Sequence, residues 1–164
     1  MKTVFWLSIY AGALAALVVV SFVQLLYLES MRLRSRDFDA LNYFKETIAP
    51  RLGMETDQAA LIFSLYKHSL LVCIGVLAFY LSDGSPTPVV DIVQGIFVAL
   101  VSMAICSYLL PQLMYRRATG AVLKPLVPLL KLAALLMKPF AALLRFAETP
   151  VSYTHLTLPT NREV

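Results

Sequence analysis

The stretch from Asp91 to Phe146 decides the fold. Its first part, DIVQGIFVALVSMAICSYLLPQLMY (Asp91–Tyr115), contains the roughly 20 apolar residues that a helix needs to cross a hydrocarbon core of about 30 Å. Its second part, KPLVPLLKLAALLMKPFAALLRF (Lys124–Phe146), carries a basic residue at every seventh position. These basic residues are Lys124, Lys131, Lys138 and Arg145. On an α-helix they form one slowly drifting stripe, so we predict a membrane span followed by a helix on the membrane surface.

The composition indicates a membrane protein. Hydrophobic residues make up 59% of the 164 residues and charged residues only 15%, against roughly 25% charged in a soluble domain. The net charge of +4 lies mainly beside the predicted spans, which favours contact with anionic lipid headgroups over nucleic acid. Cys73 and Cys106 each lie within a predicted span, where a free thiol acts as a small apolar filler.

Three spans are predicted, at about residues 3–27, 59–81 and 92–115. The first is too long for the apolar region of a signal peptide. Residues 30–50 have apolar side chains at intervals of three to five, which predicts an amphipathic helix on the interface. Residues 120–147 contain Pro125, Pro128 and Pro139, so we expect two or three short helices joined by kinks. The expected fold is an all-α integral membrane protein with three transmembrane helices, an amphipathic insert after the first and a belt of short basic juxtamembrane helices after the third.

Basic residues predict the orientation. Arginines follow the first and third spans closely, whereas the loop at Ser82–Asp91 has no Lys or Arg. These arginines are Arg32, Arg34, Arg36, Arg116 and Arg117. Short basic loops stay in the cytoplasm, so we expect the loop and the N-terminus to face outward in a multi-pass protein of the bacterial inner (plasma) membrane.

The last fourteen residues, VSYTHLTLPTNREV, differ abruptly in composition from the Leu- and Ala-rich chain before them. They resemble a translated sequencing-library adapter. On this reading residues 1–149 are one membrane domain, residues 150–164 are a non-native tail, and the natural gene continues beyond this point.

From Met1 to about Glu148 the layout resembles the transmembrane domain of the CNNM/CorC family, the hemolysin-like magnesium transporters. SYLLPQLMYRRATGAVLKPLVPLLKLAALLMKPFAALLRF is similar to the family's segment built on G-E-x-x-P-K and a leucine-rich helix. SFVQLLYLESMRLRSRDFDAL is similar to the segment where the family's first span leaves the membrane. The resemblance implies transport of Mg²⁺, a homodimer, and cytosolic CBS domains downstream of this chain.

The same resemblance implies metal ligands at Ser21, Ser69 and Ser107. Ser21 matches a serine of the family's first span, and Ser69 falls near the asparagine-bearing segment of its second span. The G-E-x-x-P-K motif keeps Pro111, but Tyr108 stands where the resemblance implies the carboxylate of the ion site.

Ionisable residues inside a span are functional candidates because their burial is costly. Lys67 and His68 are such residues, and Glu29 is the nearest carboxylate, at the cytoplasmic end of the first span. Lys67 could replace the missing cation by pairing with Glu29 or with carbonyls freed by Pro111, or it could extend to the interface. His68 could act as a proton-linked switch, because imidazole titrates near physiological pH, or it could hydrogen-bond a neighbouring helix.

No catalytic motif stands out in the sequence, so we do not expect an enzyme. Two functions remain as hypotheses. The first is divalent-cation transport or a role derived from it, and the alternative is a non-transporting membrane scaffold or regulatory subunit that has lost the ion site.

Overall fold

The computed structural model describes residues 2–32, 38–81 and 87–148, and these ranges are almost entirely helical. Arg34, Arg36, the middle of the loop at 82–86 and the tail from Thr149 onward lie outside the described residues. The elements are α1 (Lys2–Ser30), α2 (Asp39–Tyr43), η1 (Phe44–Ile48), α3 (Ala49–Leu52), α4 (Thr56–Leu81), α5 (Pro88–Ser102), η2 (Met103–Leu109), α6 (Leu110–Arg117), η3 (Gly120–Leu126) and α7 (Val127–Glu148). Because α5, η2 and α6 follow one another without a break, they form one long helix, hereafter the third span helix.

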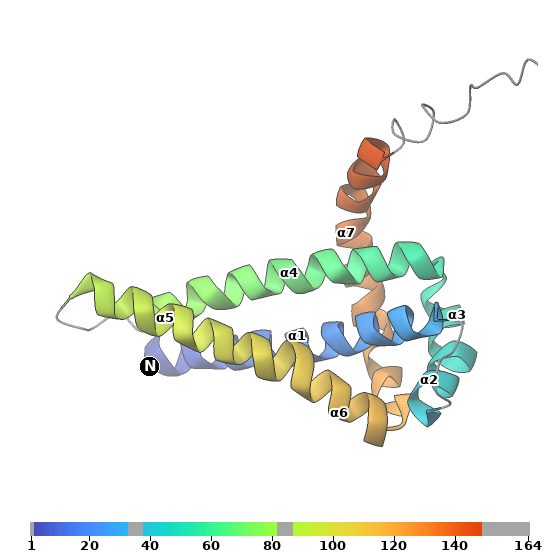
Figure 1. Cartoon of the computed structure of the whole chain (residues 1–164), viewed down its shortest axis with the longest axis horizontal. Coiled ribbons are helices and arrows are strands. Elements are labelled where there is room, and N and C mark those ends of the chain that lie inside the picture. The colour runs from blue at the N-terminus through green and yellow to red at the C-terminus, as the bar shows by residue number, and fades with distance from the viewer. Residues whose placement is uncertain (1, 33–37, 82–86, 149–164) are drawn as a thin grey trace, which may run out of the picture.

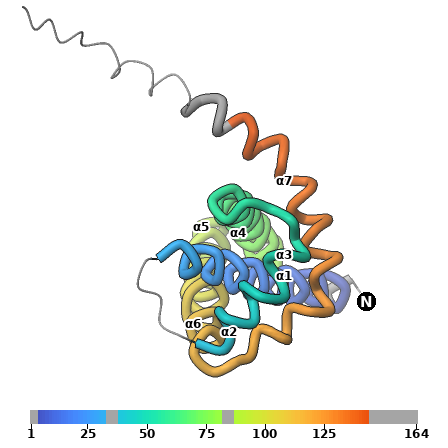
Figure 2. The backbone as a smooth tube through the Cα atoms, turned by 90° about the vertical axis from the view of Figure 1, so that its right-hand side faces the viewer, coloured from blue at the N-terminus to red at the C-terminus, as the bar shows by residue number. Residues whose placement is uncertain are grey.

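The long helices have two directions. Figure 1 shows α1, α4 and the third span helix extended along the long axis of the molecule, whereas α7 runs steeply across that axis. The end-on view in Figure 2 also shows α7 rising across the other helices. Trp6 of α1 packs on Tyr80 of α4 at one end of the bundle, with ring centroids 4.9 Å apart. The short helices α2 and α3 lie at the opposite end.

Four helical segments of the described chain are long and apolar enough to cross a membrane: Val4–Ser30, Thr56–Leu81, Pro88–Arg117 and Gly120–Leu143. The all-helical membrane character predicted from composition is therefore consistent with the structure. The third span helix begins earlier than predicted and already contains Asp91. Pro88 explains this start, because the first turn of a helix has no partner for the N–H that proline lacks.

The segment between α1 and α4 differs in detail from the predicted amphipathic helix at 30–50. It forms α2, η1 and α3, which end at Gly53 in a left-handed conformation with φ of 64°. Its apolar side chains at Leu41, Phe44 and Ile48 are buried in the protein core. The apolar periodicity was therefore read correctly, but in this structure that face packs on the protein.

The prediction of two or three short helices joined by kinks is met only in part, because η3 is followed by one long helix, α7, which contains Pro139. This residue lies inside α7, which continues without a break to Glu148. The chain changes helix type only at Val127, between the 3-10 turn η3 and α7. Pro139 is exposed on α7, so its ring lies away from the packed face. The carbonyl one turn earlier, which has no N–H donor because proline lacks one, lies on that side too.

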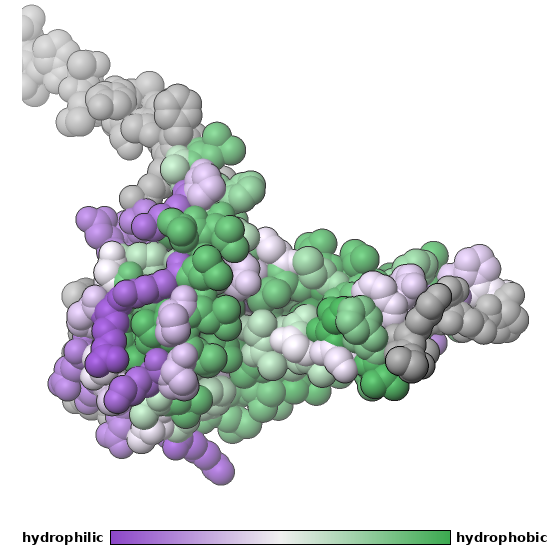
Figure 3. Space-filling model, turned by 180° about the vertical axis from the view of Figure 1, so that it is seen from behind, coloured by the Kyte–Doolittle hydropathy of each residue, from purple (hydrophilic) through white to green (hydrophobic). Residues whose placement is uncertain are grey.

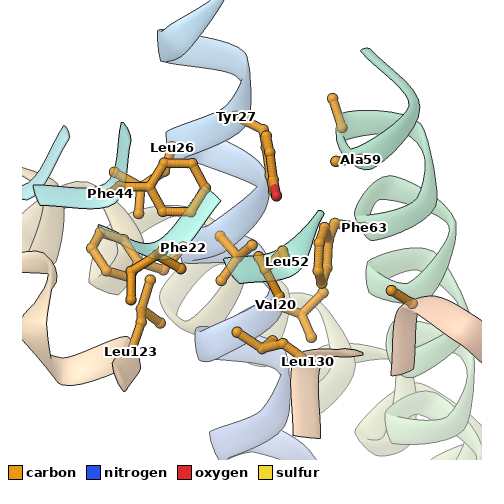
Figure 4. Close-up of a cluster of buried hydrophobic side chains, with 14 of the residues drawn as sticks. Val20, Phe22, Leu26, Tyr27, Phe44, Leu52, Ala59, Phe63, Leu123 and Leu130 are labelled. Carbon is orange, nitrogen blue, oxygen red and sulfur yellow. The ribbon is translucent and has the colours of Figure 1, made fainter. Parts of the chain in front are cut away.

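The main core lies at the end of the bundle that carries α2 and α3. Figure 4 shows its side chains converging from α1, from the short helices, from the start of α4 and from the η3–α7 segment. The largest buried members include Phe22, Leu26, Tyr27, Phe44, Phe63 and Leu123. Figure 3 shows hydrophilic side chains gathered at this same end, while the opposite part of the bundle has a mostly hydrophobic surface. The outer surface of that part is the one suited to lipid.

Candidate functional site

Two serines far apart in sequence meet at the contact between α1 and the third span helix. The Ser21 hydroxyl donates a hydrogen bond to the Ser107 hydroxyl, with 3.4 Å between the two oxygen atoms. Their residues are only 3% and 6% exposed. The structure therefore brings together two of the three residues that the resemblance implies as metal ligands.

Ser107 lies in the π-helical segment η2, and this affects the backbone around it. The N–H of Leu110 donates to the carbonyl of Ile105, five residues earlier. The next residue, Pro111, has no N–H, so a carbonyl one turn earlier, at Cys106 or Ser107, loses its helical donor. A π segment of this kind often marks a functional site, and here it leaves a backbone oxygen close to the serine pair in sequence.

Gln24 adds a third buried polar side chain that the sequence analysis did not select. It lies one turn after Ser21 on α1 and is 8% exposed. Residues three apart on an α-helix share a face, so the Gln24 amide and the Ser21 hydroxyl lie on the same side of α1. The available signal was the spacing of Tyr10, Leu14, Leu17, Ser21 and Gln24, which places them on one helical stripe.

A second polar contact joins the same two helices. The Tyr10 hydroxyl and the Ser102 hydroxyl form a hydrogen bond of 2.9 Å. Leu17, Ile74 and Cys106 form a separate buried apolar cluster, and Tyr10 packs against it. The contact between α1 and the third span helix thus combines two hydroxyl pairs with a buried apolar cluster.

Lys67 contacts an aromatic ring, a partner that none of the alternatives drawn from the sequence named. Its ammonium lies 5.5 Å from the centre of the Tyr108 ring, in cation–π geometry. Glu29 instead pairs with Arg32, with 2.7 Å between the charged atoms. The proposed Lys67–Glu29 pair is therefore not formed, because Glu29 is held at the end of α1 by its own neighbour.

His68 and Ser69 lie on an exposed face of α4, apart from the buried serine pair. The Nδ1 of His68 donates to the Ser64 carbonyl over 2.7 Å, and the Ser69 hydroxyl donates to the Leu65 carbonyl over 3.0 Å. Both are bonds within one helix turn, which such side chains commonly form. The structure does not bring Ser69 to Ser21 and Ser107.

The buried serine pair offers two neutral hydroxyl oxygens, and the buried Gln24 amide lies one turn away from Ser21 on α1. Within the described ranges, no three His, Cys, Asp or Glu side chains gather as a metal-binding group. Mg²⁺ prefers oxygen ligands and usually retains several waters, so this set fits a transient, partly hydrated cation better than a tightly held one. No protein-family model, curated protein or solved structure matches this chain.

Proposed function

We propose that this chain is the membrane domain of a divalent-cation transporter, as its resemblance to the CNNM/CorC family implies, with Mg²⁺ as the transported ion. The observation that carries the proposal is the buried Ser21–Ser107 contact, with 3.4 Å between the hydroxyl oxygens. These residues are 86 positions apart, and both are positions where the resemblance implies metal ligands. Their hydroxyls, the Gln24 amide and the carbonyl freed by Pro111 would replace part of the hydration shell of the ion.

The surface of α7 supports the membrane arrangement of this proposal. One side of α7 exposes large apolar residues at intervals of three and four: Leu129, Leu132, Leu136, Phe140 and Leu143. By helical geometry the exposed Lys131 and Lys138 lie on roughly the opposite side. In Figure 3 the hydrophobic surface of α7 is turned toward the hydrophobic part of the bundle. This pattern supports a helix in the interface plane, with its apolar side in lipid and its lysines at anionic headgroups.

On this arrangement α1, α4 and the third span helix cross the membrane, and α7 lies on its cytoplasmic surface. The end with α2, α3 and the Arg116–Arg117 pair then faces the cytoplasm of a bacterial inner membrane, and the N-terminus faces outward. A homodimer and downstream CBS domains belong to the same proposal through the family resemblance.

Calorimetric titration of Mg²⁺ into the purified chain in detergent tests this function. Ser21→Ala removes a hydroxyl of the buried pair, whereas Ser8→Ala removes a hydroxyl from an exposed position on the same helix and is the matched control. We expect saturable binding in the unmodified chain and in Ser8→Ala, and clearly weaker binding in Ser21→Ala. Absence of binding, or equal binding in all three proteins, would overturn the assignment of the ion site.

A second function is favoured by the position of Lys67. Its ammonium lies over the ring of Tyr108, the residue that stands where the resemblance implies a carboxylate. A fixed positive charge here could take the electrostatic place of the ion, as expected of a membrane scaffold or regulatory subunit that does not transport. If the Lys67→Met variant binds Mg²⁺ and the unmodified chain does not, the scaffold function is supported.

A further inference from the structure

A small polar cavity lies where the third span helix ends beside α2. Figures 1 and 2 both place the end of α6 next to α2. The cavity has a volume of about 140 Å³, and its lining is mainly polar. Its walls are residues 38–39 at the start of α2 and residues 115–119 at the end of α6 and in the link to η3.

Packing contacts on both sides hold the shape of this cavity. The rings of Phe38 and Tyr115 meet edge to face, with their centroids 4.9 Å apart. The backbone of Ala118 is extended, which ends α6 and turns the chain toward η3. Gly120 packs so closely on α2 that an added Cβ would lie 2.9 Å from a backbone oxygen of that helix. The segment between Tyr115 and Gly120 is therefore anchored at both ends.

The charged side chains of the cavity favour an anion. Arg116 and Arg117 contribute two positive charges and Asp39 one negative charge, which gives the lining a net charge of +1. Neither arginine forms an ion pair with a residue of the described ranges. Both are exposed, so a ligand can reach them from outside the protein.

A phosphodiester matches this lining. Planar guanidinium groups bind phosphate oxygens through paired hydrogen bonds, and the hydroxyl of Thr119 is a further donor in the lining. The volume corresponds to roughly five water molecules at about 30 Å³ each, which is enough for the five heavy atoms of a phosphate group. The carboxylate of Asp39 disfavours the second negative charge that a free phosphate acquires near neutral pH, so a singly charged phosphodiester fits better.

The position of the cavity favours a membrane phospholipid as the source of this phosphodiester. The third span helix, Pro88–Arg117, has 30 residues, which corresponds to a length of about 45 Å. A bilayer measures about 40–45 Å with its headgroup regions and about 30 Å without them. On the membrane arrangement proposed above, the arginines at the end of this helix therefore lie at the level of the headgroups.

We propose that Arg116, Arg117 and Thr119 bind the phosphodiester of one anionic phospholipid molecule, with Asp39 restricting the site to a singly charged group. This is one defined site, unlike the general attraction of the α7 lysines for anionic headgroups. The proposal rests on the proposed membrane arrangement but not on ion transport. Its test contains no Mg²⁺, so the lipid site and the ion site can fail separately.

Native mass spectrometry of the full chain in detergent measures the affinity for each successive lipid molecule. In a titration with phosphatidylglycerol, which carries one phosphodiester and one negative charge, we expect a first lipid that binds more tightly than all later ones. The double variant Arg116→Gln/Arg117→Gln should weaken binding of this first lipid by on the order of tenfold or more, because charge-assisted hydrogen bonds are lost.

The matched control is Lys131→Gln/Lys138→Gln, which removes the same charge from exposed residues of α7. It should change the affinity of the first lipid by about twofold or less. Equal weakening by the two double variants would show only general attraction between charges and would overturn the site. Lower thermal stability with unchanged lipid affinity in Arg116→Gln/Arg117→Gln would also overturn it, because the arginines would then only stabilise the end of α6.

Inorganic phosphate, added as a competitor to the same titration, distinguishes the lipid from a soluble ligand. We expect it to leave the first lipid bound to the unmodified chain and to displace the lipid more readily from Asp39→Asn, which lacks the repelling carboxylate. Displacement of the lipid from the unmodified chain at equal phosphate concentration would overturn the assignment to a phospholipid.

Discussion

The ammonium of Lys67 on α4 lies 5.5 Å from the centre of the Tyr108 ring on the third span helix. The contact joins two helices through a charge that is costly to keep within the membrane. Because Tyr108 follows Ser107 directly in η2, the contact also connects α4 to the segment that carries the candidate ion site.

A double-mutant cycle measures this contact. Lys67→Met and Tyr108→Leu should each remove it, and we expect a coupling free energy of about 1 kcal/mol in unfolding experiments in detergent. Additive effects of the two substitutions would show that Lys67 extends to the interface and makes no energetically significant contact with the ring.

The buried hydroxyl of Tyr27 predicts an unusual stabilising substitution. Tyr27 is 1% exposed, and its hydroxyl has no hydrogen-bond partner in the described part of the chain. A buried polar group without a partner costs about 1–3 kcal/mol, so Tyr27→Phe should leave the free energy of unfolding unchanged or raise it by about 1 kcal/mol.

The matched control is Tyr27→Leu, which also removes the ring contacts with Phe44 and Phe63. It should lower the free energy of unfolding by roughly 2 kcal/mol or more. A clear loss of stability in Tyr27→Phe would mean that the hydroxyl forms a bond in the folded protein.

Substitution of glycine by alanine is expected to change the free energy of unfolding in opposite directions at two positions. A Cβ at Gly120 would lie 2.9 Å from the backbone oxygen of Ala40, so Gly120→Ala must push η3 away from α2. We expect a loss of about 1–3 kcal/mol in the free energy of unfolding.

Gly12 in α1 has no atom within 4 Å of an added Cβ, and Gly12→Ala should stabilise α1 by roughly 0.5–1 kcal/mol. Thermal unfolding of both variants in the same detergent gives the comparison. Equal effects at the two positions would contradict the close packing of η3 on α2.

Fluorescence quenching can decide whether α7 lies on the membrane or crosses it. Trp6 is the single tryptophan, so Trp6→Phe provides a background for a new Trp at Phe140, on the exposed apolar side of α7. With α7 in the interface, lipids brominated near the headgroup should quench this Trp more strongly than lipids brominated near the chain ends.

Leu135→Trp is the control for this measurement, because Leu135 is similarly exposed but lies toward the lysine side of α7. Its Trp should be quenched less. Strongest quenching of the Phe140→Trp variant by deep bromine would instead indicate that α7 is a fourth span.

Local features of the sequence were sufficient to predict the helices. The apolar runs have the length of membrane helices, and the backbone of such a run must satisfy its own hydrogen bonds in lipid, so helix was predictable in each case. Gly53 and Pro88 lie at real boundaries, because their backbone conformations depend on the residue itself, although the predicted third span began only at residue 92.

Only the tertiary structure decided how these helices meet. Side chains from different helices form the Ser21–Ser107 contact, the Lys67–Tyr108 contact and the apolar cluster that contains Leu17. The π segment η2 adds one residue to a turn, which rotates every later side chain by about 100° relative to a regular α-helix. A prediction from sequence spacing assumes a regular helical period. It therefore indicated that Ser107 lies in a span but not which helix Ser107 faces. The Glu29–Arg32 pair, by contrast, is local, because its two residues lie three positions apart at the end of α1. The pairing of helices is what local sequence could not determine, because each contact depends on a side chain from a distant segment.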